Sequence, residues 1–230
     1  MKTTKFKGIT NVLGGGLPNA KVTKNCTAMM IIDMQYVDAH RDFGIGAIGK
    51  LNGVQENMEY YFSRLEKSTI PNIRTILDAC RNAKMPVIHV RVMNKSMGSH
   101  DTSWRYKCMG ILVPPGHKDS EFIDELTPLN NEIVLDKTTS SVFVSTNADF
   151  LLRNMGINTL IMTGVVTNNC VESSTRTAGD LGYRVLLIED ATAAWTQEGH
   201  DAAIRHLDHN FAVVKSTQQV LDEIAALDMA

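Results

Sequence analysis

Three residues with complementary chemistry stand just beyond apolar segments of the sequence. Asp33 and Lys137 follow the apolar runs 28–32 and 133–135, and Cys170 follows a later run across a short polar turn. The start of a helix and a nearby ammonium both favour the thiolate, the reactive form of cysteine. A carboxyl group can take the thiol proton and return it to a leaving amine. Backbone N–H groups of a turn can stabilise an oxyanion. Together these groups would support acyl transfer through a thioester.

Each of the three residues also has a plainer interpretation. Asp33 could cap a turn, and Lys137 could be a solvated surface residue. Cys170 could be a small buried hydrophobic residue, as most free cysteines are. The case for chemistry therefore depends on whether the fold brings the three together.

Alternating apolar and amphipathic segments predict the fold class. We expect strands at residues 28–32, 86–90, 133–135, 159–162, 184–188 and 211–214. We expect helices at about 52–84, 147–155, 169–181, 198–209 and 217–227. Apolar strands separated by helices indicate a parallel sheet covered on both faces. The prediction is an α/β fold, a three-layer α/β/α sandwich whose mostly parallel sheet has roughly six strands. In such sheets ligands bind beyond the carboxyl ends of the strands, where the acid, the base and the thiol are expected.

Two segments modify this plan. The helix at 52–84 should be interrupted before Pro71, because proline disfavours the helical state of the residue before it. The stretch 93–131 has weak periodicity and predicts an elaborated connection with a short helix around 121–126. A connection of this length is usually functional or disordered. We expect one domain over residues 1–230, with 1–24 as an N-terminal extension.

Composition excludes several classes of function. The chain has 230 residues, 23 basic and 25 acidic, and a net charge of −2. This balance gives no electrostatic footprint for nucleic acid and no polybasic face for a membrane. There is no signal-peptide pattern and no run of 18 apolar residues, so the expected location is the cytoplasm. The cysteines are widely spaced and are expected to be free thiols: Cys26, Cys80, Cys108 and Cys170. The expected partner is a small-molecule substrate.

Three strings around these residues resemble the signatures of the isochorismatase-like cysteine hydrolases. They are Ile31-Ile32-Asp33-Met34-Gln35, Asp136-Lys137-Thr138-Thr139-Ser140-Ser141-Val142-Phe143 and Thr163-Gly164-Val165-Val166-Thr167-Asn168-Asn169-Cys170-Val171-Glu172-Ser173. Their order and spacing agree, and the match runs from about residue 25 to the C-terminus. The resemblance implies a catalytic triad of Asp33, Lys137 and Cys170. It also implies a cis peptide between Val165 and Val166, with the N–H groups of Val166 and Cys170 as the oxyanion hole. Members of the family commonly form dimers or tetramers, so we expect a homodimer or homotetramer.

Departures from the patterns of individual branches narrow the expected activity. Isochorismatases proper lack a thiol where Cys170 stands. Nicotinamidases hold a metal with an Asp-x-His pair and a further histidine, whereas residues 91–101 contain no such pair, and His89 and His100 do not restore one. We therefore expect no metal and no cofactor. The string from Cys170 to Arg176 is similar to that of N-carbamoylsarcosine amidase, ureidoacrylate amidohydrolase and biuret hydrolase.

The resulting prediction is a metal-independent cysteine amidohydrolase. It would cleave a C–N bond of a small linear amide, ureide or carbamoyl compound through a thioester and release ammonia. A nicotinamidase-like, metal-assisted amidase and a non-catalytic binding protein on the same fold are the alternatives.

Substrate contacts are expected from polar and aromatic residues near the strand ends. Arg105 is the preferred anchor for a substrate carboxylate, because guanidinium binds carboxylates bidentately. The further candidates are Gln35, Asn168 and Lys107 for polar contacts, and Tyr36, Phe43 and Trp104 for an apolar wall. Either the 93–131 connection or a neighbouring subunit would close the pocket, and the sequence leaves open which amide or ureide enters it.

Overall fold

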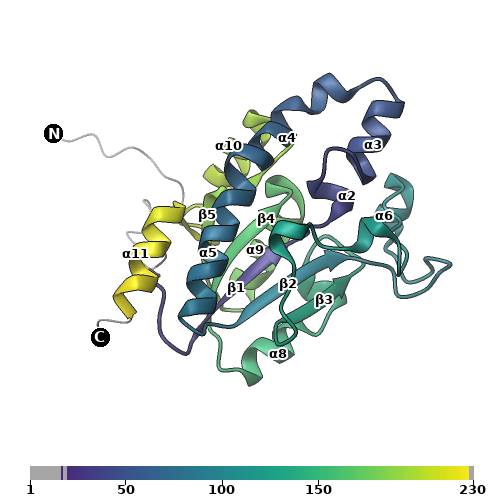
Figure 1. Cartoon of the computed structure of the whole chain (residues 1–230). Coiled ribbons are helices and arrows are strands. Elements are labelled where there is room, and N and C mark those ends of the chain that lie inside the picture. Colours follow the sequence, from purple (N-terminus) through teal and green to yellow (C-terminus); the bar gives the residue numbers. More distant parts are fainter. Residues whose placement is uncertain (1–16, 18–19, 228–230) are drawn as a thin grey trace.

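A parallel sheet of six strands forms the centre of the molecule. The structure is a computed structural model that describes Leu17 and residues 20–227. The strands are β1 (Thr27–Ile32), β2 (Val87–Val92), β3 (Ile133–Lys137), β4 (Thr159–Val165), β5 (Arg184–Ala193) and β6 (Val213–Lys215). Their order is β3-β2-β1-β4-β5-β6, and every neighbouring pair is parallel (Figure 1). The predicted fold class is confirmed.

The strand order reverses beside β1, which positions the site. The chain runs outward from β1 through β2 to β3, and then returns to the other side of β1 to place β4, β5 and β6. The carboxyl ends of β1 and β4 therefore diverge into connections that leave in opposite directions. Such a switch point leaves a crevice where ligands bind in open α/β sheets.

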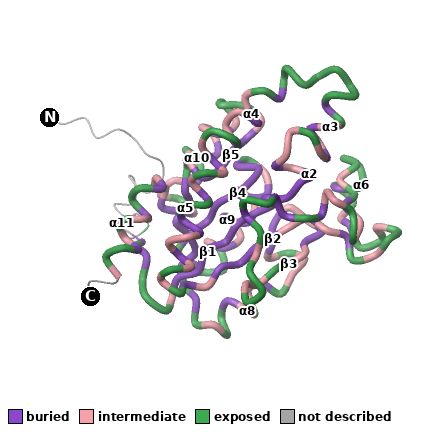
Figure 2. Tube along the Cα trace, in the orientation of Figure 1, coloured by how far each residue is buried: buried purple, intermediate pink, exposed green. Residues whose placement is uncertain are grey.

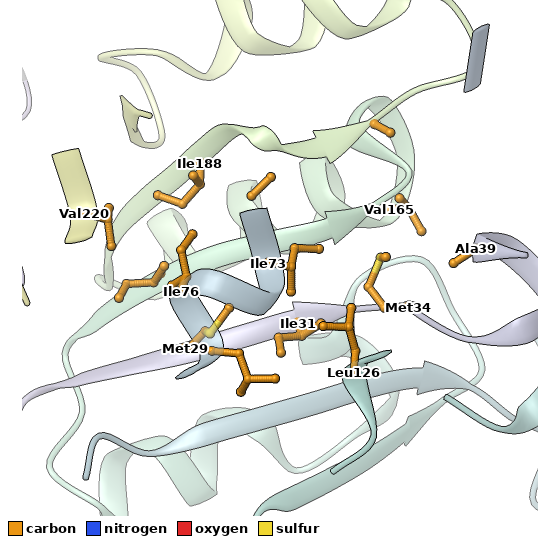
Figure 3. Close-up of a cluster of buried hydrophobic side chains, with 14 of the residues drawn as sticks. Met29, Ile31, Met34, Ala39, Ile73, Ile76, Leu126, Val165, Ile188 and Val220 are labelled. Atoms are coloured by element: carbon orange, nitrogen blue, oxygen red, sulfur yellow. The ribbon is translucent and has the colours of Figure 1, made fainter. Parts of the chain in front are cut away.

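Helices cover both faces of the sheet and bury its side chains. They are α2 (Tyr36–Ala39), α3 (Gly44–Leu51), α4 (Glu59–Arg64), α5 (Ile70–Asn82), α6 (Trp104–Met109), α7 (Val142–Ser145), α8 (Ala148–Asn154), α9 (Glu172–Asp180), α10 (Gln197–Leu207) and α11 (Thr217–Leu227). On one face, residues of α4, α5 and α11 join the cluster that contains Met29 and Ile31 of β1. Figure 3 shows Ile73 and Ile76 of α5 in this cluster. On the other, α8, α9 and α10 join the cluster that contains Met30 and Ile32. Alternate residues of β1 thus enter opposite cores, as a strand's period of two requires. Figure 2 shows the strands as the buried centre.

The predicted break before Pro71 is instead a π-helical turn. Helix α4 continues through Leu65–Thr69 in π geometry and then into α5, whose first turn contains the proline. Proline is tolerated in a first helical turn, where its missing N–H has no partner to lose. A wider turn just before it lets the helical path continue. The expectation was wrong in predicting an interruption rather than a change of helical pitch.

The connection between β2 and β3 contains only short helical segments among the described residues. It contains α6 and two 3₁₀ turns, Lys118–Ser120 and Asp124–Leu126, where a helix at 121–126 was expected. Ser103 caps α6 by accepting a hydrogen bond from Tyr106 N at 3.3 Å, and Gly110 ends it with a φ of 72°. A small hydroxyl cap and a left-handed glycine are ordinary helix boundaries. Figure 1 places α6 on the side of the molecule where β2 and β3 end.

No helix in the described part of the chain is long and apolar enough to cross a membrane.

Candidate active site

The acid, the base and the thiol are delivered by three different strands. Asp33 directly follows β1, Lys137 is the last residue of β3, and Cys170 lies in the π-helical turn Thr167–Val171 between β4 and α9. Asp33 has a φ of 53°, a left-handed conformation that aspartate tolerates better than most residues. These positions are all at the carboxyl edge of the sheet.

A glycine allows β4 to end close against β1. Gly164 has a φ of 105°, and a Cβ at this position would lie 2.0 Å from the carbonyl oxygen of Ile32. Any larger residue would push the two strands apart. The glycine therefore keeps the turn that carries Cys170 next to the residue that follows Ile32, which is Asp33.

The three predicted catalytic side chains meet in a buried cluster. Lys137 Nζ lies 2.8 Å from Asp33 Oδ2 and 3.4 Å from Cys170 Sγ. It also donates to the carbonyl oxygen of Thr139 at 3.1 Å. Lys137 is fully buried, and Asp33 and Cys170 are 1% and 6% exposed. The sequence prediction that these residues share one site is confirmed by this geometry, while their catalytic roles stay a prediction.

A tyrosine that the sequence analysis missed completes the cluster. The hydroxyl of Tyr106 lies 3.2 Å from Cys170 Sγ and accepts a hydrogen bond from Lys137 Nζ at 3.4 Å. Because the ammonium can only donate, the phenolic proton is free to point at the sulfur. Tyr106 belongs to α6 and is 1% exposed. The weak periodicity of residues 93–131 gave no signal that this tyrosine turns inward.

Burial and charge act against one another in the cluster. Burial raises the pKa of Cys170 to about 12, although the ammonium of Lys137 opposes that rise. Burial likewise raises the pKa of Asp33 against the same opposing charge. Burial alone would lower the pKa of Lys137, but the negative charges of Asp33 and Cys170 hold it well above its ordinary value. These shifts favour a protonated thiol beside a charged lysine.

Asp33 has an oxygen available to receive a proton. Its Oδ1 is buried and accepts no hydrogen bond from any residue that the structure describes. A second carboxyl, that of Asp38 in α2, is half-buried. Burial, together with the charge of Asp33, raises the pKa of Asp38 to about 7. The sequence analysis did not single out Asp38.

The turn that carries the thiol has the backbone feature implied by the resemblance. A cis peptide joins Val165 and Val166. The Val166 carbonyl accepts hydrogen bonds from Asn169 N at 2.9 Å and Val171 N at 3.3 Å. Val166 and Cys170, whose N–H groups are the predicted oxyanion hole, thus belong to one compact turn.

Arg105 lies beside this turn. Its guanidinium donates to Ser140 Oγ at 2.6 Å and to Asn169 Oδ1 at 3.0 Å, and it lies 5.7 Å from the centre of the Tyr106 ring. Arg105 is exposed, as is its neighbour Trp104, at 81%. The guanidinium is thus both solvent-accessible and fixed next to the residues that contact the thiol.

Gln35 is used differently from a typical ligand-binding residue. It is fully buried; its amide donates to the carbonyl oxygens of Val92 and Asp119, both at 3.0 Å, and accepts from Val92 N at 2.6 Å. Both of its N–H groups are therefore engaged by main chain. This side chain ties the end of β1 to β2 and to the connection, and its contact with substrate stays a prediction.

The other predicted pocket residues lie around the same edge. Tyr36 packs edge-on against Phe43 at 4.9 Å between ring centres, and its hydroxyl donates to Asp124 Oδ1 at 3.0 Å. Asn168 is exposed in the turn before Cys170. Their contacts with substrate also stay predictions.

The histidines considered for a metal site lie apart. His89 lies in β2 with its Nε2 2.9 Å from Oε2 of Glu132, the residue before β3, and His100 is exposed in the connection. Among residues 20–227, no three or more His, Cys, Asp or Glu side chains gather as a possible metal site.

Comparison with known proteins agrees with this geometry. The model of the isochorismatase domain matches residues 27–219. The chain is 34% identical over 158 residues to nicotinamidase 3 of Arabidopsis thaliana, an alignment covering 68% of this chain and 79% of the relative. It is 31% identical over 219 residues to a ureidoacrylate amidohydrolase of Pantoea ananatis, covering 88% and 83%. Among solved structures, a cysteine hydrolase from Pseudomonas syringae superposes with a TM-score of 0.76 at 23% identity, covering 91% and 97%. The chain belongs to the isochorismatase family.

Proposed function

We propose that this protein is a metal-independent cysteine amidohydrolase of a small linear amide, ureide or carbamoyl compound. At the coarser level it is an enzyme, a hydrolase acting on carbon–nitrogen bonds of linear amides. The observation that carries the finer proposal is the buried contact of Lys137 with both Asp33 and Cys170, at 2.8 and 3.4 Å.

The proposed reaction begins with transfer of the thiol proton from Cys170 to Asp33. The sulfur then attacks the amide carbon, and the carbonyl oxygen takes up the negative charge. The N–H groups of Val166 and Cys170 would bind this oxyanion. Asp33 returns the proton to the nitrogen, the C–N bond breaks and ammonia leaves. Water, deprotonated by Asp33, hydrolyses the thioester and regenerates the thiol.

Formation of the thiolate is the step for which this site needs its extra donors. Because burial raises the pKa of Cys170 to about 12, an isolated buried thiol would not ionise at neutral pH. Lys137 Nζ at 3.4 Å and the Tyr106 hydroxyl at 3.2 Å would both donate to the sulfur once it is charged. Hydrogen bonds to a charged partner are the strong ones.

Arg105 supports a substrate that carries a carboxylate at the end remote from the scissile bond. Ser140 and Asn169 hold its guanidinium, and Asn169 immediately precedes Cys170. A pre-positioned guanidinium would bind a carboxylate and orient the carbonyl towards the sulfur.

The test is ammonia release from a panel of ureides, carbamoyl amino acids, aliphatic amides and nicotinamide. The wild type should release ammonia from at least one ureide or carbamoyl compound, and Cys170→Ala should retain its fold by circular dichroism but lose that turnover. Near wild-type turnover by Cys170→Ala would rule out the nucleophile. No ammonia from any compound would favour the non-catalytic alternative.

A nicotinamidase-like, metal-assisted amidase is the second candidate, because a relative at 34% identity is named nicotinamidase 3. It is distinguished by nicotinamide as the best substrate and by activity that a chelator removes and zinc or iron restores. Activity on a ureide that is unchanged by a chelator supports the metal-independent proposal.

Assembly and location complete the proposal. We infer a homodimer or homotetramer, for which light scattering coupled to size exclusion gives the direct measurement. A monomer that is fully active would contradict it. The cytoplasmic location stays a prediction.

A further inference from the structure

We propose that Arg64 and His200 are positioning residues that hold the Cys170 turn in place through Thr167. This inference rests on the proposed function, because it assigns a role in the same reaction. Arg64 ends α4 and His200 lies in α10, so neither belongs to the strand ends that supply the reacting groups.

A continuous hydrogen-bonded chain joins these helices to the turn. Arg64 Nη2 lies 2.9 Å from His200 Nε2, and His200 Nδ1 lies 3.0 Å from Thr167 Oγ1. Thr167 is fully buried and His200 is 4% exposed. Thr167 is the first residue of the turn Thr167–Val171, directly after the cis peptide and three residues before the sulfur.

The arginine fixes which nitrogen of the histidine carries the proton. A guanidinium only donates, so His200 Nε2 must accept and be unprotonated. The remaining proton of a neutral ring is then on Nδ1, which donates to Thr167 Oγ1. Burial, followed by the nearby charge of Arg64, lowers the pKa of His200 to about 4, which agrees with a neutral ring.

Arg64 is itself fixed by main chain. Its guanidinium donates to the carbonyl oxygens of Thr192 and Glu189, both at 3.0 Å, in β5. Arg64 thus fixes the histidine relative to β5, a strand inside the sheet, and not only relative to α10. The hydrogen bond from His200 to Thr167 extends this constraint to the turn that carries the thiol.

Positioning should matter more for the chemical step than for binding. The sulfur must keep its distances to Lys137 and Tyr106, and the N–H groups of the turn must face the developing oxyanion. A displacement of about 1 Å at reacting atoms can cost about 100-fold in rate. Loss of the anchor should therefore lower kcat while leaving KM near its wild-type value.

A matched control exists on the same pair of helices. The Tyr60 hydroxyl donates to Gln197 Oε1 at 2.9 Å, which also joins α4 to α10 but at the exposed side. Tyr60→Phe removes a helix–helix hydrogen bond without touching the turn. If the role of His200 were only to pack α10 against α4, the two substitutions would act alike.

The experiment compares His200→Ala, His200→Asn, Thr167→Val and Tyr60→Phe. Two readouts are used: ammonia release from the panel compound that the wild type turns over fastest, and the rate at which iodoacetamide alkylates Cys170, followed by peptide mass spectrometry. The second readout needs no substrate. His200→Ala should lower kcat about 10- to 100-fold with KM changed less than about threefold, and should slow alkylation. Tyr60→Phe should leave both unchanged.

Rescue and non-additivity make the test specific. An asparagine amide can place its N–H where Nδ1 donates, so His200→Asn should recover most of the lost kcat. Because both changes break the same hydrogen bond, the double variant His200→Ala/Thr167→Val should have a kcat no lower than that of the more impaired single variant. If His200→Ala does not fold, Thr167→Val is expected to give the same loss of kcat.

The inference would be overturned if the losses of kcat in His200→Ala and Thr167→Val added up in the double variant. It would also be overturned if both single variants had the same kcat as Tyr60→Phe. If Cys170→Ala is inactive while these variants are fully active, only the positioning role fails. If Cys170→Ala remains active, the proposed function itself fails.

Discussion

The strand ends and the β2–β3 connection contribute to one site by different structural means. Asp33, Lys137 and Cys170 follow or end β1, β3 and β4, which are hydrogen-bonded into the sheet. Tyr106 and Arg105 reach the same site from α6, in which Tyr106 is the single buried residue. The strand ends thus fix the reacting groups through the main cores of the fold, whereas the buried residue of α6 packs in a small cluster with Val37, Val92 and Val113. Substitutions of the charged residues at the strand ends should therefore affect stability and chemistry together, and removal of polar groups from α6 should affect mainly activity.

The largest effect is expected at the strand ends, from Lys137→Met. It removes the cation that pairs with buried Asp33 at 2.8 Å and faces the sulfur. Turnover should fall about 1000-fold or more. Breaking a buried ion pair should also lower the free energy of unfolding by about 3–5 kcal/mol. Steady-state kinetics and urea unfolding measure the two. A loss of turnover with unchanged stability would contradict the proposed coupling at the strand ends.

Tyr106→Phe tests the contribution of the connection to the chemistry. The ring stays in place, but the hydroxyl 3.2 Å from Cys170 Sγ is lost. A hydrogen bond to a charged group contributes about 1.5–3 kcal/mol, so kcat should fall about 10- to 100-fold. The melting temperature should change little. An unchanged kcat would mean that the hydroxyl does not act on the thiolate.

Arg105→Ala tests recognition rather than chemistry. For a substrate with a carboxylate, KM should rise about 10-fold or more while kcat changes little, because the ion-paired contact is lost. For an uncharged amide, neither should change. Lys107→Ala is the matched control, since Lys107 is exposed on the same helix and donates to the His100 carbonyl. An increase in KM with Lys107→Ala instead would move the anchor to the lysine.

The smallest effect is expected where the connection enters β3. Burial alone would raise the pKa of Glu132, but Arg81, Leu129 N and His89 together lower it to about 2. A carboxyl whose pKa is lowered by folding stabilises the folded state fully when the pH is above its ordinary pKa of 4.5. This contribution is lost as the pH falls towards the folded-state pKa of about 2. Urea unfolding at pH 5 and pH 3 should show a drop that is smaller in Glu132→Gln. An equal drop in both proteins would contradict this assignment.

What could be predicted follows the same division. The strand ends carry a strong signal, because apolar runs end at Asp33 and near Lys137 and the order of strands brings them to one edge. Arg105 could be proposed from its chemistry alone. Tyr106 could not, because one inward-facing residue in a six-residue helix produces no periodicity. The chain His200–Thr167 was also missed, because it joins residues 33 positions apart through side chains that packing alone orients.

Two local features could not be predicted from the sequence alone. The rule that residues before proline avoid the helical conformation predicted a break at Pro71, but a π turn accommodates the proline. The end of β2 and the connection supply main-chain partners for the whole amide of Gln35, a structural role that its place after Asp33 did not reveal, while its contact with substrate stays a prediction. Both outcomes depend on tertiary neighbours that the local sequence does not contain.

The most direct test of the central claim is mass spectrometry of the protein quenched in acid during turnover of its best ureide or carbamoyl substrate. We predict an acyl adduct on the peptide that contains Cys170 and on no peptide that contains Cys26, Cys80 or Cys108. The adduct should form at least as fast as ammonia is released, and it should be absent in Cys170→Ala together with turnover. Continued turnover in Cys170→Ala, or an adduct on another cysteine, would contradict the account.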